Sequence, residues 1–302
     1  MIPIAFLAST ATLPGAAHRR DDAWQHDLEF AELVLGCRRA GIHLDAVAWD
    51  DAQIEWGRYH GAVVGTTWDY TARPDFFLER LEQIAGAVQG RLWNSPKLIS
   101  WNARKTYLAA LSDAGAVSVP TVWLDSCAPD LIAAAFDDLA TDELVIKPVI
   151  GAGAWRQIRL RRGDDLPPAD HLPPKAALAQ PFLHSIVREG EYSFLFFGER
   201  FSHALIKRPA PGDYRIQAKY GGREAAIKPL ADDIAAAAEV LAKAPEAPLY
   251  ARVDMARLDD GRLAVMELEL IEPYFYVEQG RNCGDIFAAA LLDRIRLSLA
   301  DR

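Results

Sequence analysis

Residues 250–273 read YARVDMARLDDGRLAVMELELIEP and contain the clearest structural pattern of the chain. On both sides of Asp260-Gly261, apolar and polar residues alternate with a period of two, a pattern typical of β-strands. An Asp-Gly pair commonly closes a two-residue turn, because both central positions favour positive φ. The stretch therefore predicts a β-hairpin with its turn at residues 260 and 261.

A two-residue turn would decide which side chains of the two strands face each other. Asp254 would lie opposite Glu267, and Arg252 opposite Glu269, with all four on one face. The other face would be apolar and would carry Val253, Met255, Met266, Leu268 and Leu270. Opposed carboxylates destabilise a sheet unless a cation neutralises them, and Mg²⁺ prefers carboxylate oxygens. The hairpin is therefore either a magnesium site or an ordinary strand pair with a solvated acidic face.

Length, composition and charge narrow the class of protein. The chain has 302 residues, of which 51% are hydrophobic and 25% charged, as in globular proteins of about two domains. Its formal net charge of −9 argues against nucleic-acid or anionic-membrane partners. The three cysteines lack metal-ligand spacing, and we find neither a signal peptide nor a run of about 18 apolar residues. We therefore expect a cytoplasmic protein.

Residues 1–95 have the rhythm of an α/β domain. Apolar runs at 2–8, 44–49 and 61–65 predict buried strands, and helical spacing predicts helices over 23–40 and 76–87. In the first of these helices the spaced apolar residues are Trp24, Leu28, Ala31 and Leu35. Such a domain binds ligands at the carboxyl ends of its strands. The candidate substrate residues there are Asp22, Trp68, Asp69 and Tyr70, although the aromatic ones could equally fill a core.

A phosphate-binding segment is expected in the middle of the chain. Residues 144–148, LVIKP, predict a strand with Lys147 near its end, and Gly151-Ala152-Gly153 follows directly. Glycine lets backbone amides approach an anion, and lysine supplies positive charge. The alternative is an ordinary hairpin turn, because the segment lacks the P-loop pattern. A second lysine, Lys105, is expected on a helix that follows Pro96 and Ser100.

The order of cations and carboxylates suits a magnesium–nucleotide triphosphate. Cations at 105, 147, 207, 208, 215 and 252 precede or flank the carboxylates of the hairpin. Lysines and glycine amides would hold phosphates, carboxylates would hold metal, and arginines would stabilise the transferred charge.

At this point the sequence resembles the ATP-grasp superfamily, over roughly residues 95–285. The motifs that carry the resemblance are Lys105, VIKP, the GAG loop, AQPFL, GEYSF, DYRIQ, RVD and MELE. The segments TTWDY, LWNSP, WNARKTYL and ELIEPYFY are similar to bacterial glutathione-synthetase-like proteins, including the D-cycloserine-forming cyclo-ligase. The resemblance implies an α/β protein with an α+β C-terminal part. It would have an N-terminal Rossmann-like parallel domain (1–95), an ATP-grasp central domain (96–190) and a C-terminal domain with the metal site (191–302).

The same resemblance implies a role for individual residues. ATP would be held by Lys105, Lys147, Gly151, Ala152, Gly153, Gln180, Pro181, Phe182, Leu183, Glu191 and Lys207. Two Mg²⁺ ions would be held by Asp254, Glu267 and Glu269, and Arg215 and Arg252 would stabilise the reacting groups. The chain departs from the family pattern at Glu269, where asparagine is frequent. It also has Glu272-Pro273-Tyr274 in place of a glycine-rich substrate loop, which makes Tyr274 a further substrate candidate.

We therefore expect an ATP- and Mg-dependent ligase that forms a carbon–nitrogen bond through an acyl phosphate on an amino-acid-like small molecule. Three alternatives remain open: an intramolecular cyclo-ligase, a kinase, and an ATP-binding module without chemistry. A homodimer is the default expectation for the assembly.

Overall fold

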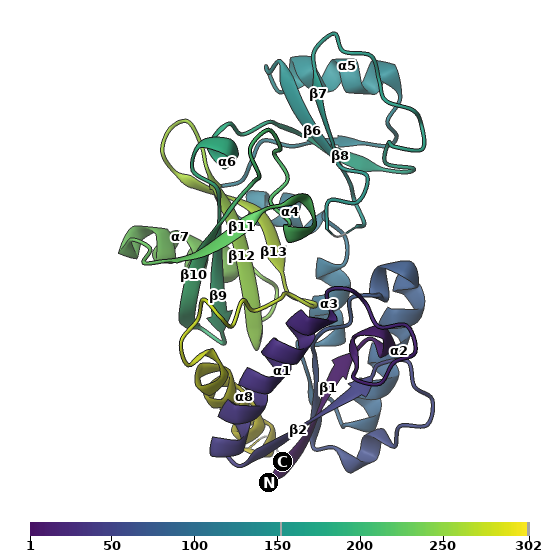
Figure 1. Cartoon of the computed structure of the whole chain (residues 1–302), viewed down its shortest axis with the longest axis vertical. Helices are drawn as coiled ribbons and strands as arrows, with labels where there is room; N and C mark the ends of the chain where they lie inside the picture. The colour runs from purple at the N-terminus through teal and green to yellow at the C-terminus, as the bar shows by residue number, and fades with distance from the viewer. Residues whose placement is uncertain (152, 301–302) are drawn as a thin grey trace.

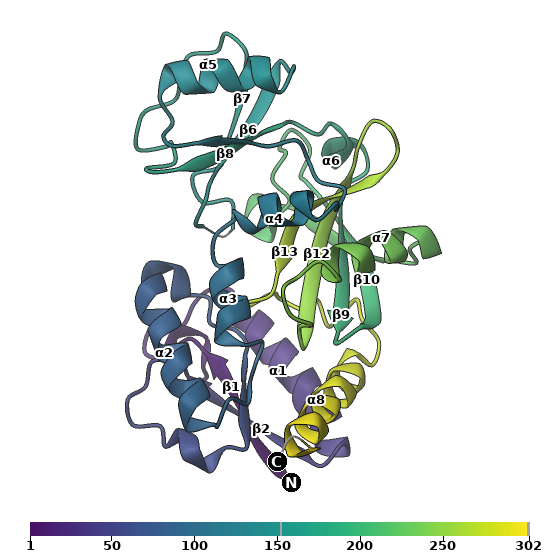
Figure 2. The same cartoon turned by 180° about the vertical axis from the view of Figure 1, so that it is seen from behind.

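The structure is a computed structural model that describes residues 1–151 and 153–300. Its strands form three sheets, which follow one another along the long axis of the molecule (Figures 1 and 2). One sheet is parallel and two are antiparallel, so the expected α/β fold with an α+β C-terminal part is confirmed. Within the described residues, no helix is both long enough and apolar enough to cross a membrane.

The N-terminal sheet is parallel and has the strand order β2-β1-β3-β4. Ile2 pairs with Ile42 and Leu7 with Val64, so the carboxyl ends of the central strands lie at one edge of the sheet. The predicted strands and helices of this part are confirmed to within a few residues. The elements are β1 (Ile2–Ala8), α1 (Ala23–Arg39), β2 (Ile42–Ala48), β3 (Gly61–Val64), α2 (Pro74–Ala87) and β4 (Leu92–Trp93).

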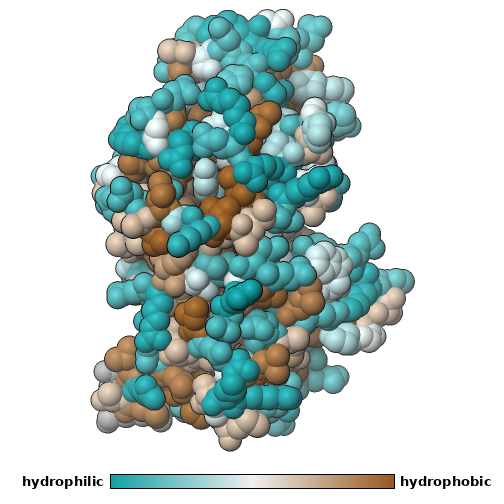
Figure 3. All heavy atoms as spheres, turned by 60° about the vertical axis from the view of Figure 1, so that its left-hand side comes forward, coloured by the Kyte–Doolittle hydropathy of each residue, from teal (hydrophilic) through white to brown (hydrophobic). Residues whose placement is uncertain are grey.

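Helix α1 has its spaced apolar residues on the outside of the molecule. Trp24 and Leu35 are both 51% exposed and Leu28 is 38% exposed, whereas His26 and Glu29 are buried. The inner face of α1 packs against the C-terminal helix α8 (Cys283–Ala300), seen as the purple and yellow helices in Figure 1. The two helices touch at glycines, so a Cβ atom on Gly36 would lie 2.1 Å from the carbonyl oxygen of Gly284. On the face shown in Figure 3, hydrophobic patches interrupt a mainly hydrophilic surface.

The sheet at the top of Figure 1 is antiparallel, with the order β5-β8-β6-β7. Helix α5 covers it, and a small core forms from Ile132, Phe136, Leu144 and Ala179. Its elements are β5 (Val122–Leu124), α5 (Pro129–Asp138), β6 (Glu143–Pro148), β7 (Ile158–Arg161) and β8 (Ala177–Pro181).

The third sheet is antiparallel and has the order β11-β10-β9-β12-β13. Leu98 of α3 and Leu108 of α4 pack in the same core as Phe194, Val253 and Leu268. The domain limits 1–95, 96–190 and 191–302 stay predictions, and α3, α4 and α8 pack across them. The elements are α3 (Pro96–Asn102), α4 (Tyr107–Asp113), β9 (Glu191–Phe197), β10 (Arg200–Arg208), β11 (Arg223–Ile227), α7 (Ala231–Leu241), β12 (Tyr250–Arg257) and β13 (Leu263–Glu269).

The predicted hairpin is β12–β13, and its functional register is confirmed. Arg252 pairs with Glu269 and Asp254 with Glu267. The two-residue turn is wrong, because the amide of Leu258 bonds the carbonyl of Arg262, which leaves three residues in the loop. Within the described residues, Gly261 has a positive φ of 87° and Asp260 does not.

A β-bulge in β13 restores the register that the longer loop shifts. The pairing slips between Asp254 and Met255, where Met255 pairs with Val265. Val265 is therefore buried in the core, and Met266, which we expected on the apolar face, lines a cavity on the opposite face.

Candidate active site

A cavity of about 430 Å³ has walls from the two antiparallel sheets and from loops and helix α1 of the N-terminal part. Eighteen of the predicted site residues line it: Asp22, Trp68, Lys105, Lys147, Gly151, Gly153, Gln180, Pro181, Phe182, Leu183, Glu191, Lys207, Arg215, Arg252, Asp254, Glu267, Glu269 and Tyr274. Ala152 lies outside the described residues. The sequence motifs therefore converge on one cavity, although they are spread over most of the chain.

Two of the proposed substrate residues lie elsewhere. The carboxylate of Asp69 accepts a hydrogen bond from Nε1 of Trp49 at 2.8 Å, within the N-terminal domain. Tyr70 is buried and lines a second, smaller cavity of about 70 Å³. Of the three residues 68–70 that follow β3, Asp69 and Tyr70 therefore make contacts within the N-terminal part, and Trp68 reaches the main cavity.

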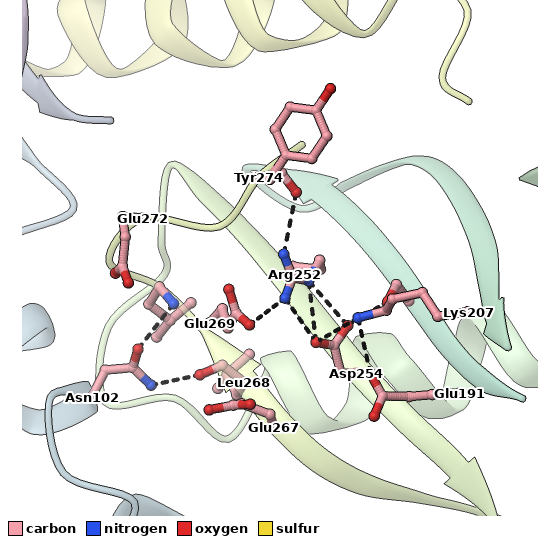
Figure 4. A network of polar contacts seen from close by, with 12 residues as sticks. Asn102, Glu191, Lys207, Arg252, Asp254, Glu267, Leu268, Glu269, Glu272 and Tyr274 are labelled. Carbon is pink, nitrogen blue, oxygen red and sulfur yellow. Dashed lines mark hydrogen bonds and ion pairs between the residues drawn. The ribbon is translucent and has the colours of Figure 1, made fainter. Parts of the chain in front are cut away.

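Arg252 is the centre of a buried polar network on β12 and β13 (Figure 4). Its Nε donates to Oδ1 of Asp254 at 3.0 Å, and its Nη2 donates to Glu269. Its Nη1 also donates to the carbonyl oxygen of Tyr274, at 3.3 Å. Burial alone would raise the pKa of Asp254, but Arg252 and then Lys207 outweigh it and hold that pKa below its ordinary value. Asp254 is therefore a carboxylate held ionised in a buried site.

Lys207 joins the strands β9, β10 and β12. Its Nζ lies 2.9 Å from Oε1 of Glu191 and 3.2 Å from Oδ2 of Asp254. Burial lowers the pKa of Lys207, but the two carboxylates outweigh it and raise the pKa above its ordinary value. Lys207 is therefore neutralised by two acids, and its role in this structure is to orient Glu191 and Asp254.

Lys105 is not on a helix as expected. Helix α3 ends at Asn102 and α4 begins at Tyr107, so Lys105 lies in the turn between them. Its amide donates to the carbonyl of Val149 at 2.9 Å, and its Nζ pairs with Glu267. The turn places the ammonium group beside the carboxylates of β13.

Lys147 is the expected cation at the end of a strand. Its Nζ donates to Oε1 of Gln180 on β8 at 3.2 Å, and no ion pair of Lys147 occurs among the described residues. Burial lowers the pKa of Lys147 despite the opposing charge of Glu267, and the nearby charge of Lys105 lowers it further. A half-buried lysine that forms no ion pair among those residues favours an anionic ligand, and a phosphate group fits this requirement.

Arg215 lies in the loop between β10 and β11 and lines the cavity. Both oxygens of Asp213 accept hydrogen bonds from its guanidinium, at 3.0 and 2.7 Å. The guanidinium also stacks over the ring of Tyr220, 3.7 Å from its centroid. These contacts hold the cation in a fixed orientation while it faces the cavity.

The carboxylates of the hairpin fit a magnesium ion by their chemistry. Asp254, Glu267 and Glu269 present hard oxygen donors to the same cavity. In the described part of the chain, however, no three acidic, histidine or cysteine side chains are grouped closely enough to hold a metal. Lys105 and Arg252 occupy these oxygens instead. Burial raises the pKa of Glu269 to about 7 despite Arg252, so a further positive charge would be favourable beside it.

Helices α3 and α4 fix the free edge of β13 from behind. Nδ2 of Asn102 donates to the carbonyl of Leu268 at 2.7 Å, and Oδ1 accepts from the amide of Leu270 at 2.9 Å. The hydroxyl of Tyr107 accepts from the amide of Leu268 at 3.0 Å. Because Leu268 and Leu270 flank Glu269, these bonds position the acidic side of the strand.

The sequence reasoning missed several residues that line the cavity. Arg20 forms a bidentate pair with Asp22 and lies over the ring of Trp68, 5.7 Å from its centroid. Nε1 of Trp68 donates to the backbone carbonyl of Glu272 at 3.1 Å. Arg20 could have been predicted, because it lies two residues from the candidate Asp22 in the same loop. Lys219 also lines the cavity, but no sequence motif pointed to it.

Comparison with known proteins agrees with this geometry. A family model described as the N-terminal domain of D-cycloserine synthetase DcsG matches residues 4–94. The cycloserine biosynthesis protein DcsG of Streptomyces lavendulae is 29% identical over 286 residues, which cover 89% of this chain and 95% of that protein. The crystal structure of D-cycloserine synthetase DcsG superposes with a TM-score of 0.80 at 26% identity, covering 97% and 99% of the two chains.

A more distant likeness shows the shared fold. D-alanine–D-alanine ligase from Bacillus anthracis, complexed with ATP, superposes with a TM-score of 0.68 at 13% identity over 100% of both chains. The fold is that of the ATP-grasp ligases, and the similarity to DcsG in sequence and structure supports an ATP-dependent ligase of this class. Among such enzymes, the chain is similar to D-cycloserine synthetase over nearly its whole length.

Proposed function

We propose that the chain is a cyclo-ligase, which closes a ring within one amino-acid-like substrate at the expense of ATP. The observation that carries the proposal is the cavity, which combines lysines suited to phosphate with a buried arginine–carboxylate network. The similarity to DcsG over 95% of that protein supports ring closure over the joining of two substrates.

The chemistry requires two displacements. An oxygen of the substrate carboxylate attacks the γ-phosphorus of ATP, the bond to ADP breaks, and an acyl phosphate forms. A nitrogen of the same molecule then attacks the acyl carbon, its proton leaves, and the bond to phosphate breaks. Lys105 and Lys147 would bind the phosphates, and Arg215 and Arg252 would stabilise the negative charge that develops on oxygen.

Magnesium would be held by Asp254, Glu267 and Glu269, after these side chains exchange their present cationic partners for the metal. The bound metal would neutralise phosphate charge. We propose two ions, in line with the superfamily resemblance. Gln180 to Leu183 would line the adenine, and Glu191 would bind the ribose hydroxyls.

The function is tested by ADP release with Mg-ATP against a panel of amino acids and their ureido derivatives, followed by product mass. Ring closure gives a product lighter than its single substrate, a two-substrate ligase gives joined masses, and a kinase gives a stable phosphorylated product. Asp254→Asn and Glu267→Gln should both abolish substrate-dependent ADP release. Asp259→Asn, in the exposed loop of the same hairpin, is the matched control. Undiminished turnover in both active-site variants would contradict the assignment.

We propose in addition that the chain forms a homodimer through α1. The exposed stripe of Trp24, Leu28 and Leu35 supports it, because exposed apolar patches commonly mark protein–protein interfaces. Light scattering after gel filtration should give a dimer for the wild type and a monomer for Leu28→Glu. Leu230→Glu, which changes an exposed leucine elsewhere, should remain dimeric. A monomeric wild type would refute the assembly.

A further inference from the structure

The carboxylates that line the active-site cavity differ in whether a lysine or arginine of the protein forms an ion pair with them. Five of them have a cationic partner: Asp22 with Arg20, Glu191 with Lys207, Asp254 with Arg252, Glu267 with Lys105, and Glu269 with Arg252. Glu272 takes part in no ion pair within the described part of the chain, and no dashed line reaches its side chain in Figure 4. It is therefore the acid that needs a positive charge from outside the protein.

The cations that interact electrostatically with Glu272 are Arg252 and Lys105, and both already have carboxylate partners. Arg252 already donates to Asp254, to Glu269 and to the carbonyl of Tyr274. Burial raises the pKa of Glu272, and the nearby carboxylates of Glu269 and Glu267 raise it further. The electrostatic field at Glu272 therefore favours a bound cation.

The backbone that carries Glu272 is held at two points. Its own carbonyl oxygen accepts from Nε1 of Trp68, at 3.1 Å, and the carbonyl of Tyr274 accepts from Arg252. The first contact joins it to the N-terminal domain and the second to Arg252, which lines the cavity. A fixed backbone suits recognition, because little conformational freedom is lost when a ligand binds.

We propose that Glu272 binds the ammonium group of an amino-acid substrate and so selects substrates that carry a free amine close to the carboxylate that is activated. This inference rests on the proposed ligase function. It also has a chemical consequence, because an ammonium held in an ion pair keeps its proton and cannot attack the acyl phosphate. The attacking nitrogen must then be a different one in the same molecule, which agrees with ring closure.

The test is the preference for an amine, measured by equilibrium binding in the presence of Mg-ADP. The probes are D-serine and 3-hydroxypropionate, which differ only in the amino group. We expect the wild type to bind D-serine about 10- to 100-fold more tightly, the range of a charge-assisted hydrogen bond. In Glu272→Gln the two affinities should come within about twofold of each other, and Glu272→Asp should keep part of the preference. Glu278→Gln, an exposed acid in the same segment that is outside the cavity wall, should match the wild type.

The outcomes separate recognition from other roles. A wild type that does not distinguish the two probes, or a Glu272→Gln variant that keeps the preference, would overturn the inference. Equal weakening of both probes in Glu272→Gln would also overturn it, since a structural or metal-binding role acts on both. Failure of every substrate to release ADP from the wild type would refute the proposed function separately, because the binding ratio needs no turnover.

Discussion

The substitution Asn102→Ala should destabilise the protein and reduce activity without touching a charged group of the site. The Asn102 side chain acts as a short strand along the free edge of β13, donating to the carbonyl of Leu268 and accepting from the amide of Leu270. Both leucines are at most 1% exposed, so water has little access to the groups that the substitution would leave without partners.

The expected magnitude follows from two unsatisfied backbone groups. Each buried polar group that loses its partner costs about 1–3 kcal/mol, so Asn102→Ala should lower the free energy of unfolding by about 2–6 kcal/mol. Tyr107→Phe removes one partner of the same edge, the acceptor for the amide of Leu268, and should cost about 1–2 kcal/mol.

Urea unfolding followed by tryptophan fluorescence measures both variants, with Gln83→Ala on the exposed side of α2 as the control. ADP release should also fall in Asn102→Ala, because Glu267 and Glu269 lose the support of their strand. A loss of less than about 0.5 kcal/mol for Asn102→Ala would show that this side chain does not complete the edge of the sheet.

Two further predictions concern packing and pH. Gly36→Ala should destabilise the protein by about 2 kcal/mol or more, because the new Cβ meets the carbonyl of Gly284. The control is Gly86→Ala on α2, where a Cβ meets no neighbour, and it should stabilise the protein by about 0.5–1 kcal/mol. Equal unfolding midpoints for the two would contradict the close contact of α1 and α8. Burial raises the pKa of Glu29 from an ordinary 4.5 to about 8, so the folded protein holds a proton that the unfolded chain has lost. The free energy of unfolding should therefore fall as pH rises through that window, by at most about 1.4 kcal/mol per pH unit, and Glu29→Gln should remove this slope while still accepting from the amide of Phe275. An unchanged slope in the variant would count against the buried, protonated carboxyl.

Alternation and turn chemistry predicted the hairpin and the pairs Arg252–Glu269 and Asp254–Glu267. The pairs are correct only because a bulge, which the sequence did not show, compensates for a longer loop. Asp260-Gly261 suits a two-residue turn and also the end of a three-residue loop, in which only the glycine needs positive φ. The longer loop shifts the register by one residue, and the bulge beside Met266 shifts it back. Bulges depend on packing across strands, which alternation along one strand does not reveal.

Helical spacing predicted α1 but not its orientation. Trp24, Leu28 and Leu35 form a regular stripe, and a stripe normally faces the core. Here the buried face carries Leu33 together with His26, Glu29 and Gly36, and Gly36 must let α8 approach, although α8 lies nearly 250 residues later in the chain. The spacing of apolar residues within one helix does not show which distant element packs against it.

The residues of the candidate site were largely predictable from the family motifs, whereas the ion pairs among them were not. Lys207 was expected on ATP, yet the sheet order places β9 between β10 and β12, which brings the lysine to Glu191 and Asp254. Which acid lacks a partner depends on such distances, so Glu272 emerged only from the structure.

We propose that the carboxylates facing the cavity bind magnesium together with the phosphates of ATP. Calorimetric titration of ATP into the wild type and Glu267→Gln, with and without Mg²⁺, tests this proposal without turnover. Mg²⁺ should tighten ATP binding to the wild type at least tenfold, and most of this gain should disappear in Glu267→Gln while ATP alone still binds near Lys105 and Lys147. The same gain from Mg²⁺ in both proteins would contradict it.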